Sequence, residues 1–227
     1  MGGRALILYE KVYPGSDLNT AADHQALLDN IEHFLPADCQ PIILSDAIFK
    51  TPWFEAIENK GCYWVGRVRG NVTLSTDNQT WHNCKHWYEQ ASSKAISLGE
   101  ISYSKATQFK CNGALYQGAK KGREKKKMRG GKSHCTTDKY YEQKAKEPWL
   151  LVSNLPQHLQ QPTMVVKLYK QRMQIEENFR DTKNGRVGIS LEYANSKTPE
   201  RFDNLLLAGC RADIIRFVVH GLCCGVT

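Results

Sequence analysis

Four polar side chains in the C-terminal half of the chain are spaced so that a helix would bring them together. Tyr169, Arg172, Glu176 and Lys183 are separated by three, four and seven residues. At about 100° per residue, the four positions fall within roughly 60° of one another around a helix axis. One face of such a helix would present a phenol, a guanidinium, a carboxylate and an ammonium in a column. A solvated charged face is the plainer interpretation of the same pattern.

The segment that carries these side chains has the pattern of one long helix, from about residue 163 to residue 183. An apolar stripe beside the polar column would anchor this helix, and its members are Val165, Leu168, Ile175 and Phe179. Asn184 and Gly185 form a typical C-terminal stop. We therefore expect an anchored helix whose polar column faces a site.

Strands and helices alternate before residue 70. We expect strands at residues 5–12, 41–44 and 62–69, and the continuous apolar run at 41–44 is typical of a strand buried on both faces. The first intervening helix begins at Asn19 or Thr20, and the second begins with Thr51-Pro52 and ends at Gly61. This order of elements indicates an α/β layer.

The third of these strands carries two arginines. Trp64 and Val68 lie on one side of it, and Arg67 and Arg69 lie on the other. The arginines could line a channel for DNA.

From Asn71 to about Lys146 the sequence loses helical periodicity, and glycine and polar residues are frequent. Basic residues gather at Lys120, Lys121, Arg123, Lys125, Lys126, Lys127, Arg129 and Lys132. We interpret the segment as a β-rich insertion with a mobile basic tip, where Lys125, Lys126 and Lys127 would bind DNA phosphates. A solvated loop without DNA accounts for the basic run equally well. A strand pattern returns from Trp149 to Leu155.

These residues resemble a known signature. Tyr169-x2-Arg172-x3-Glu176-x6-Lys183 matches the YREK signature of the cut-and-paste DDE transposases of the insertion-sequence-four family. Further segments resemble the insertion-sequence-ten branch of that family, namely Arg172–Asp181, Arg201–Asp203, Lys146–Trp149, and Ser45–Ala47 with Phe49 and Pro52-Trp53. The resemblance spans roughly residues 3–207, with the motifs in the family's order.

The resemblance implies a ribonuclease-H-like α/β core that a β-rich insertion interrupts. Asp46, at the C-terminal end of its strand, would be the second acid of the catalytic triad, and Glu176 would be the third. Together they would hold Mg²⁺ in a two-metal site for in-line phosphoryl transfer during DNA strand cleavage and transfer.

The resemblance also implies a set of DNA contacts. Tyr169, Arg172 and Lys183 would grip phosphates close to the scissile bond. Trp149 would stack on a base flipped out of the transposon end, because a flat indole accepts any base. An ordinary core tryptophan at a strand edge is the alternative for Trp149.

The chain departs from the family at both ends. The first catalytic aspartate has no counterpart, since the chain opens inside a later strand and helix capping accounts for the earliest acids, Asp17 and Asp23. After Leu207 the sequence diverges. We therefore expect a fragment without its first strand, truncated at both ends, that does not nick DNA by itself.

The expected organisation has four parts. Residues 1–70 would be the first part of the core, residues 71–148 the basic insertion, residues 149–208 the second part with the YREK helix, and residues 209–227 a divergent tail.

The bulk composition fits a globular protein that meets polyanions. Hydrophobic residues make up 41% and charged residues 24%, and the net charge is +8. No stretch is long and apolar enough to cross a bilayer, and no secretory signal is present. We expect a bacterial cytoplasmic protein associated with the nucleoid. Its expected partner is double-stranded transposon-end DNA, and the resemblance suggests a homodimer.

Eight cysteines occur without a CxxC pair, so neither a zinc ribbon nor a redox motif is supported. His82, Cys84 and His86 come nearest to a metal site, but no second ligand pair follows them.

Three functions are compatible with the sequence. The first is a transposase catalytic core, and the second is a catalytically dead DNA-binding remnant that inhibits a full-length transposase by occupying transposon ends. The third is an unrelated basic nucleic-acid-binding module, which the ordered motifs argue against.

Overall fold

The computed structural model describes residues 20–36, 38–119 and 146–175, together with residues 9, 12, 198, 200, 201 and 203–205. Several predicted features lie outside these residues: most of the strand at 5–12, the basic run with Lys125, Lys126 and Lys127, the acid Glu176 and the signature lysine Lys183. Within the described residues, no helix is both long and apolar enough to span a bilayer.

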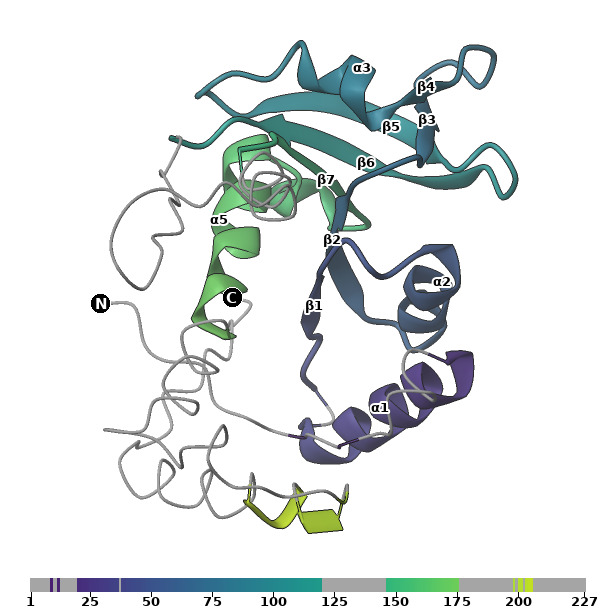
Figure 1. Cartoon of the computed structure of the whole chain (residues 1–227), viewed down its shortest axis with the longest axis vertical. Helices are drawn as coiled ribbons and strands as arrows, with labels where there is room; N and C mark the ends of the chain where they lie inside the picture. Colours follow the sequence, from purple (N-terminus) through teal and green to yellow (C-terminus); the bar gives the residue numbers. More distant parts are fainter. Residues whose placement is uncertain are drawn as a thin grey trace, which may run out of the picture. The chain divides into compact units, whose positions relative to one another are not determined.

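The elements in chain order are α1 (Ala21–Phe34), β1 (Ile42–Ser45), α2 (Thr51–Asn59), β2 (Tyr63–Val68), β3 (Thr73–Ser75), β4 (His82–Asn83), α3 (Cys84–Tyr88), β5 (Ile96–Tyr103), β6 (Phe109–Tyr116), β7 (Trp149–Ser153), the 3-10 helix η2 (Gln157–Leu159) and α5 (Pro162–Gln171) (Figure 1). The described residues thus combine helices with a seven-stranded sheet, which confirms the predicted α/β class in its general form.

The chain divides into two compact units. One comprises Met1–Pro41, Glu55–Cys62 and Gln171–Thr227, and the other comprises Ile42–Phe54 and Tyr63–Lys170. The sheet belongs to the second unit.

In the first unit, α1 begins where the sequence predicts. The Thr20 hydroxyl oxygen accepts a hydrogen bond from Asp23 N (3.1 Å), and the Asp23 carboxylate accepts one from Thr20 N (3.3 Å). This reciprocal capping satisfies two backbone donors that the helix itself leaves unpaired. Asp23 therefore has a structural role, as expected.

Helix α2 ends at a glycine, again as predicted. Gly61 has φ +68°, a left-handed conformation that an L side chain rarely adopts. Gly61 N donates to Glu58 O (2.8 Å) and Cys62 N donates to Ile57 O (3.2 Å). These two bonds form a Schellman motif, which satisfies the last carbonyls of the helix.

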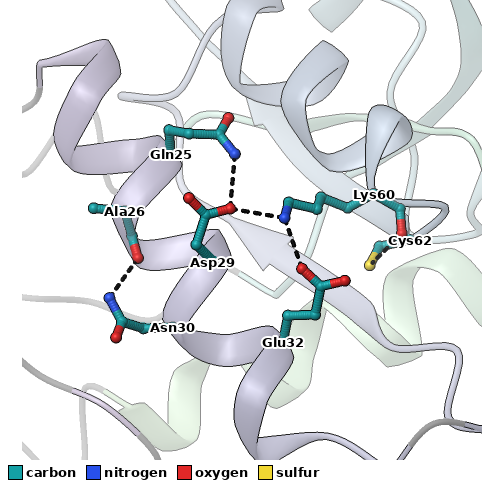
Figure 2. Close-up of polar contacts among 7 residues, drawn as sticks. All are labelled: Gln25, Ala26, Asp29, Asn30, Glu32, Lys60 and Cys62. Carbon is teal, nitrogen blue, oxygen red and sulfur yellow. Dashed lines mark hydrogen bonds and ion pairs between the residues drawn. The ribbon is translucent and has the colours of Figure 1, made fainter.

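Lys60 follows α2 and ties it to α1 (Figure 2). Its Nζ lies 2.7 Å from Asp29 Oδ1 and 2.6 Å from Glu32 Oε2, two carboxylates on the same face of α1. Hydrogen bonds from Lys60 and Gln25 lower the pKa of Asp29 below its ordinary value of 3.8. The same contacts with Asp29 and Glu32 raise the pKa of Lys60 above 10.5.

Replacing Lys60 with methionine is expected to lower the Tm slightly and to change its pH dependence. Because the pKa of Asp29 is lowered in the folded chain, its contacts stabilise the fold above pH 3.8, and this stabilisation is lost as the pH falls. Because the pKa of Lys60 is raised in the folded chain, its contacts stabilise the fold below pH 10.5, and this stabilisation is lost as the pH rises. The Tm difference between wild type and Lys60→Met should therefore be largest between these limits and shrink in high salt. Lys94→Met, at an exposed site, is the matched control, and equal Tm losses for both variants would contradict this role.

In the second unit, the strand order of the sheet is β1-β2-β7-β6-β5-β3-β4. β1 runs parallel to β2, and the remaining pairs are antiparallel. The strands after residue 71 therefore continue the same sheet. Among the described strands β1 is the terminal one, and its residues Ile42, Ile43 and Leu44 are half-buried. The expectation that this strand is buried on both faces is wrong within the described residues.

Aromatic and aliphatic side chains cover both faces of the central strands. On one face, Val165 and Tyr169 of α5 pack with Val65 and Leu151. On the other, Phe54 of α2 stacks on Trp64, with ring centroids 4.1 Å apart. The centre of the sheet is therefore a rigid platform for the residues at the strand ends.

Candidate functional site

Asp46 directly follows β1, and its place is fixed by the residues around it. Trp53 Nε1 donates to the buried Ser45 Oγ (2.7 Å), and the Phe49 ring lies 4.8 Å from the Trp53 ring. The Asp46 carboxylate accepts a hydrogen bond from Ala47 N (2.7 Å). The Ser-Asp-Ala motif and its aromatic neighbours therefore hold the half-buried Asp46 at the carboxyl end of its strand.

Arg67 lies beside Asp46, on the face of the sheet that α5 covers. Ser45 pairs with Gly66 in the parallel ladder, so Asp46 and Arg67 are the next residues along the two strands. The half-buried Arg67 donates from Nη2 to Glu147 O (3.4 Å), and its Cζ lies 5.9 Å from the centre of the Trp149 ring. None of the described residues accepts a hydrogen bond from its buried Nε.

The electrostatic surroundings of Arg67 are mixed. Burial and, next, the charge of Arg69 lower the pKa of the Arg67 guanidinium, whereas Tyr169, Tyr88 and Asp46 act in the opposite direction. A guanidinium stays charged in any such environment. Two cations and the carboxylates of Asp46 and Glu147 thus share a partly desolvated site.

Arg69 is held by an ion pair. Its Nε lies 3.0 Å from Glu147 Oε2, and both side chains are about three-quarters buried, with 26% and 31% of their surface exposed. Glu147 thus contacts Arg69 through its carboxylate and Arg67 through its backbone carbonyl.

Trp149 is the first residue of β7 and is half-buried. The Tyr169 and Tyr116 rings meet it edge to face, with centroids at 5.1 Å and 6.0 Å. Two aromatic neighbours and the Arg67 guanidinium therefore fix the orientation of the indole.

Tyr169 is fully buried in the core cluster under α5, together with Val165 and Val166. Its ring closes the core beneath Trp149. Tyr169 therefore supports the Trp149 ring from within the core.

Arg172 is half-buried and lies in a turn. The predicted long helix is interrupted here: α5 ends at Gln171, residues 173–175 are helical again, and Ile175 N donates to Arg172 O (3.1 Å), a tighter three-residue turn. The predicted helix is therefore interrupted at Arg172, whereas the column from Tyr169 to Lys183 stays a prediction. Glu176 and Lys183 lie outside the described residues.

Comparison with known families decides the identity of this domain. The model of the transposase DDE domain matches residues 14–211 of the 227 residues. The chain belongs to the transposase DDE domain family. No curated protein matches it. At the level of the family, the resemblance drawn from the sequence is confirmed, and the catalytic domain of DDE transposases is ribonuclease-H-like.

DDE transposases use divalent metal ions, and Asp46 is a suitable ligand among the described residues of this chain. Asp46 is a hard oxygen donor at a strand end, which suits such an ion. Within the described part of the chain, no three His, Cys, Asp or Glu side chains gather into a metal-binding group.

The histidines and cysteine that come nearest to a metal site in the sequence do not form one. The His82 and His86 rings stack on each other, with centroids 3.8 Å apart, so their nitrogens do not converge. Burial raises the pKa of Cys84 to about 11, which keeps it a thiol at neutral pH.

Three contributors to the site in this DDE domain were not predicted from the sequence. The carboxylate of Glu147 pairs with Arg69, and the ring of Tyr116 packs against Trp149. The ammonium of Lys170 donates a hydrogen bond to Tyr116. The sequence did contain a signal for Glu147, since this residue lies in the family motif Lys146–Trp149. Tyr116 had none, because its contact with Trp149 arises from the pairing of β6 with β7.

Proposed function

We propose that the chain is a cut-and-paste transposase of the insertion-sequence-four family, which binds double-stranded DNA at transposon ends. The observation that carries this proposal is the Arg67 guanidinium over the Trp149 ring, next to Asp46 at the end of the sheet. We call Asp46, Arg67, Arg69 and Trp149 the strand-end site. Residues 71–148 would be the insertion of such an enzyme, with Lys125, Lys126 and Lys127 as further phosphate contacts.

The chemistry of the strand-end site suits DNA that is partly unpaired. A guanidinium binds phosphate oxygens with two parallel hydrogen bonds. An indole offers a flat face to an unstacked base of any sequence. Arg67 and Arg69 would therefore bind the backbone while Trp149 receives the flipped base.

In a complete enzyme of this family, magnesium would bind to the acids of the catalytic triad. Asp46 and Glu176 are the carboxylates that would hold it, and the ion would stabilise the charge that develops on the reacting phosphate oxygens. We propose further that Arg172 and Lys183 bind DNA phosphates near these acids, and that the buried Tyr169 acts indirectly by positioning Trp149. The chain would work as a homodimer on paired ends. The proposed DNA binding itself depends on the strand-end site and not on cleavage.

Purified wild-type chain is expected to bind duplex DNA carrying the element's ends in a strongly salt-dependent way. Each phosphate contact contributes about −0.9 to the slope of the logarithm of the association constant against the logarithm of the salt concentration. With three such contacts, raising NaCl from 50 to 200 mM weakens binding roughly fortyfold. Fluorescence anisotropy of a labelled duplex measures this directly.

A competition experiment separates DNA binding from general attraction to polyanions. Unlabelled duplex should displace the probe at far lower charge concentration than polyglutamate does. Equal dissociation constants at 50 and 200 mM NaCl, or equal competition by polyglutamate, would count against the proposed function.

A further inference from the structure

A lysine outside the YREK signature shares an aromatic neighbour with Trp149. Lys170 lies in α5 directly after Tyr169 and is exposed. Its Nζ lies 4.9 Å from the centre of the Tyr116 ring and donates to Tyr116 Oη at 3.5 Å. The two residues are 54 positions apart in the sequence.

Tyr116 occupies the end of β6, directly opposite Trp149 in β7. The two rings meet at an angle of 63° with their centroids 6.0 Å apart. Arg67 lies over the Trp149 ring, and Lys170 lies over the Tyr116 ring. One end of the sheet therefore presents two adjacent aromatic rings, each with a cation at its face.

We propose that Lys170 is a further DNA phosphate contact, held in place by Tyr116 beside the tryptophan that receives the unpaired base. This inference rests on the proposed function. An exposed lysine normally samples many rotamers, and fixing it for one ligand costs conformational entropy. The ring face and the hydroxyl of Tyr116 favour one position of the ammonium in advance, so less entropy is lost when a phosphate binds.

The same geometry gives Tyr116 two separable functions. Its ring face attracts the ammonium, its hydroxyl accepts a hydrogen bond from it, and its edge packs against Trp149. Tyr116→Phe removes only the hydroxyl, whereas Tyr116→Leu also removes the ring. Tyr116 is thus a positioning residue for both Lys170 and Trp149.

The test compares Lys170→Met with Lys167→Met. Both lysines are exposed on α5, so the two variants lose the same charge from the same helix. We expect Lys170→Met to weaken binding of a duplex with one unpaired base several-fold and to reduce the salt slope by about 1. Lys167→Met should change both quantities much less. The DNA affinity of Tyr116→Phe should lie between the affinities of the wild type and of Tyr116→Leu. The Leu variant should also reduce the quenching of fluorescence from an unpaired 2-aminopurine.

The outcomes separate this inference from the proposed function. If the wild-type chain binds DNA and the two lysine variants weaken it equally, Lys170 contributes only net charge and the inference is overturned. If the wild-type chain shows no salt-dependent DNA binding, the proposed function fails with it. Thermal melts of all four variants verify that the losses arise in folded protein.

Discussion

Replacing Gly66 with alanine is expected to destabilise the second unit by about 1–3 kcal/mol, the usual cost of overpacking a core. A Cβ at this position would lie 2.5 Å from Phe54 Cζ and 2.7 Å from Phe54 Cε1. The ring cannot retreat, because it is fully buried and stacks on Trp64 at 4.1 Å. Since Gly66 pairs with Ser45, the last residue of β1, the strain falls next to the strand that Asp46 follows. Urea unfolding of both proteins measures the loss.

A second substitution tests the cause of this loss. In Phe54→Leu the cavity itself destabilises the protein, but the smaller side chain makes room for a methyl group at position 66. The double variant should therefore be more stable than the sum of the two single losses indicates, a positive coupling between residues in contact. Strict additivity would mean that the predicted clash with Phe54 does not cause the loss.

Replacing Arg67 with methionine is expected to weaken DNA binding about tenfold to a hundredfold, the range for hydrogen bonds to charged groups. The same change should leave the Tm unchanged or raise it. Arg67 is partly desolvated, its Nε has no acceptor among the described residues, and Arg69 lies close enough to lower its pKa. Keeping a charge in a partly desolvated place costs free energy, and an apolar side chain of similar length avoids that cost. Affinity and stability would then move in opposite directions, as at many functional sites.

Arg67→Lys provides the matched control because it keeps the charge and loses the planar fork. We expect an intermediate affinity, since a lysine binds phosphate as a point charge but cannot bind it bidentately. A large drop in Tm for Arg67→Met with unchanged DNA affinity would assign the residue to the fold and not to DNA.

Local features of the fold could be predicted from the sequence because they depend on neighbouring residues. Thr20 with Asp23 begins α1 through reciprocal hydrogen bonds within four residues, and Gly61 ends α2 through its positive φ. The strand at Trp149 and its stop near Pro156 follow the same logic. By contrast, the single sheet depends on pairing between distant strands, such as β2 with β7, and periodicity carries no information about such partners.

The candidate site could be predicted only in part, for related reasons. Asp46, Arg67, Arg69 and Trp149 have residue types and positions that suggested DNA chemistry, and the fold brings them to one end of the sheet. Tyr169 was expected on a polar face, but α5 packs against three strands at once and buries it completely. The turn at Arg172 had no signal either, because neither glycine nor proline stands there.

Photo-crosslinking tests the strand-end site most directly. A duplex with one unpaired 5-iodouracil near its end is bound to the wild-type chain and irradiated, so that the base bonds to an aromatic ring on which it stacks. Mass spectrometry of the digested complex should place the crosslink on Trp149, and Arg67→Met should reduce its yield in step with the loss of affinity. Crosslinks confined to other aromatic residues, such as Trp81 or Trp87, would contradict the assignment of this site to DNA.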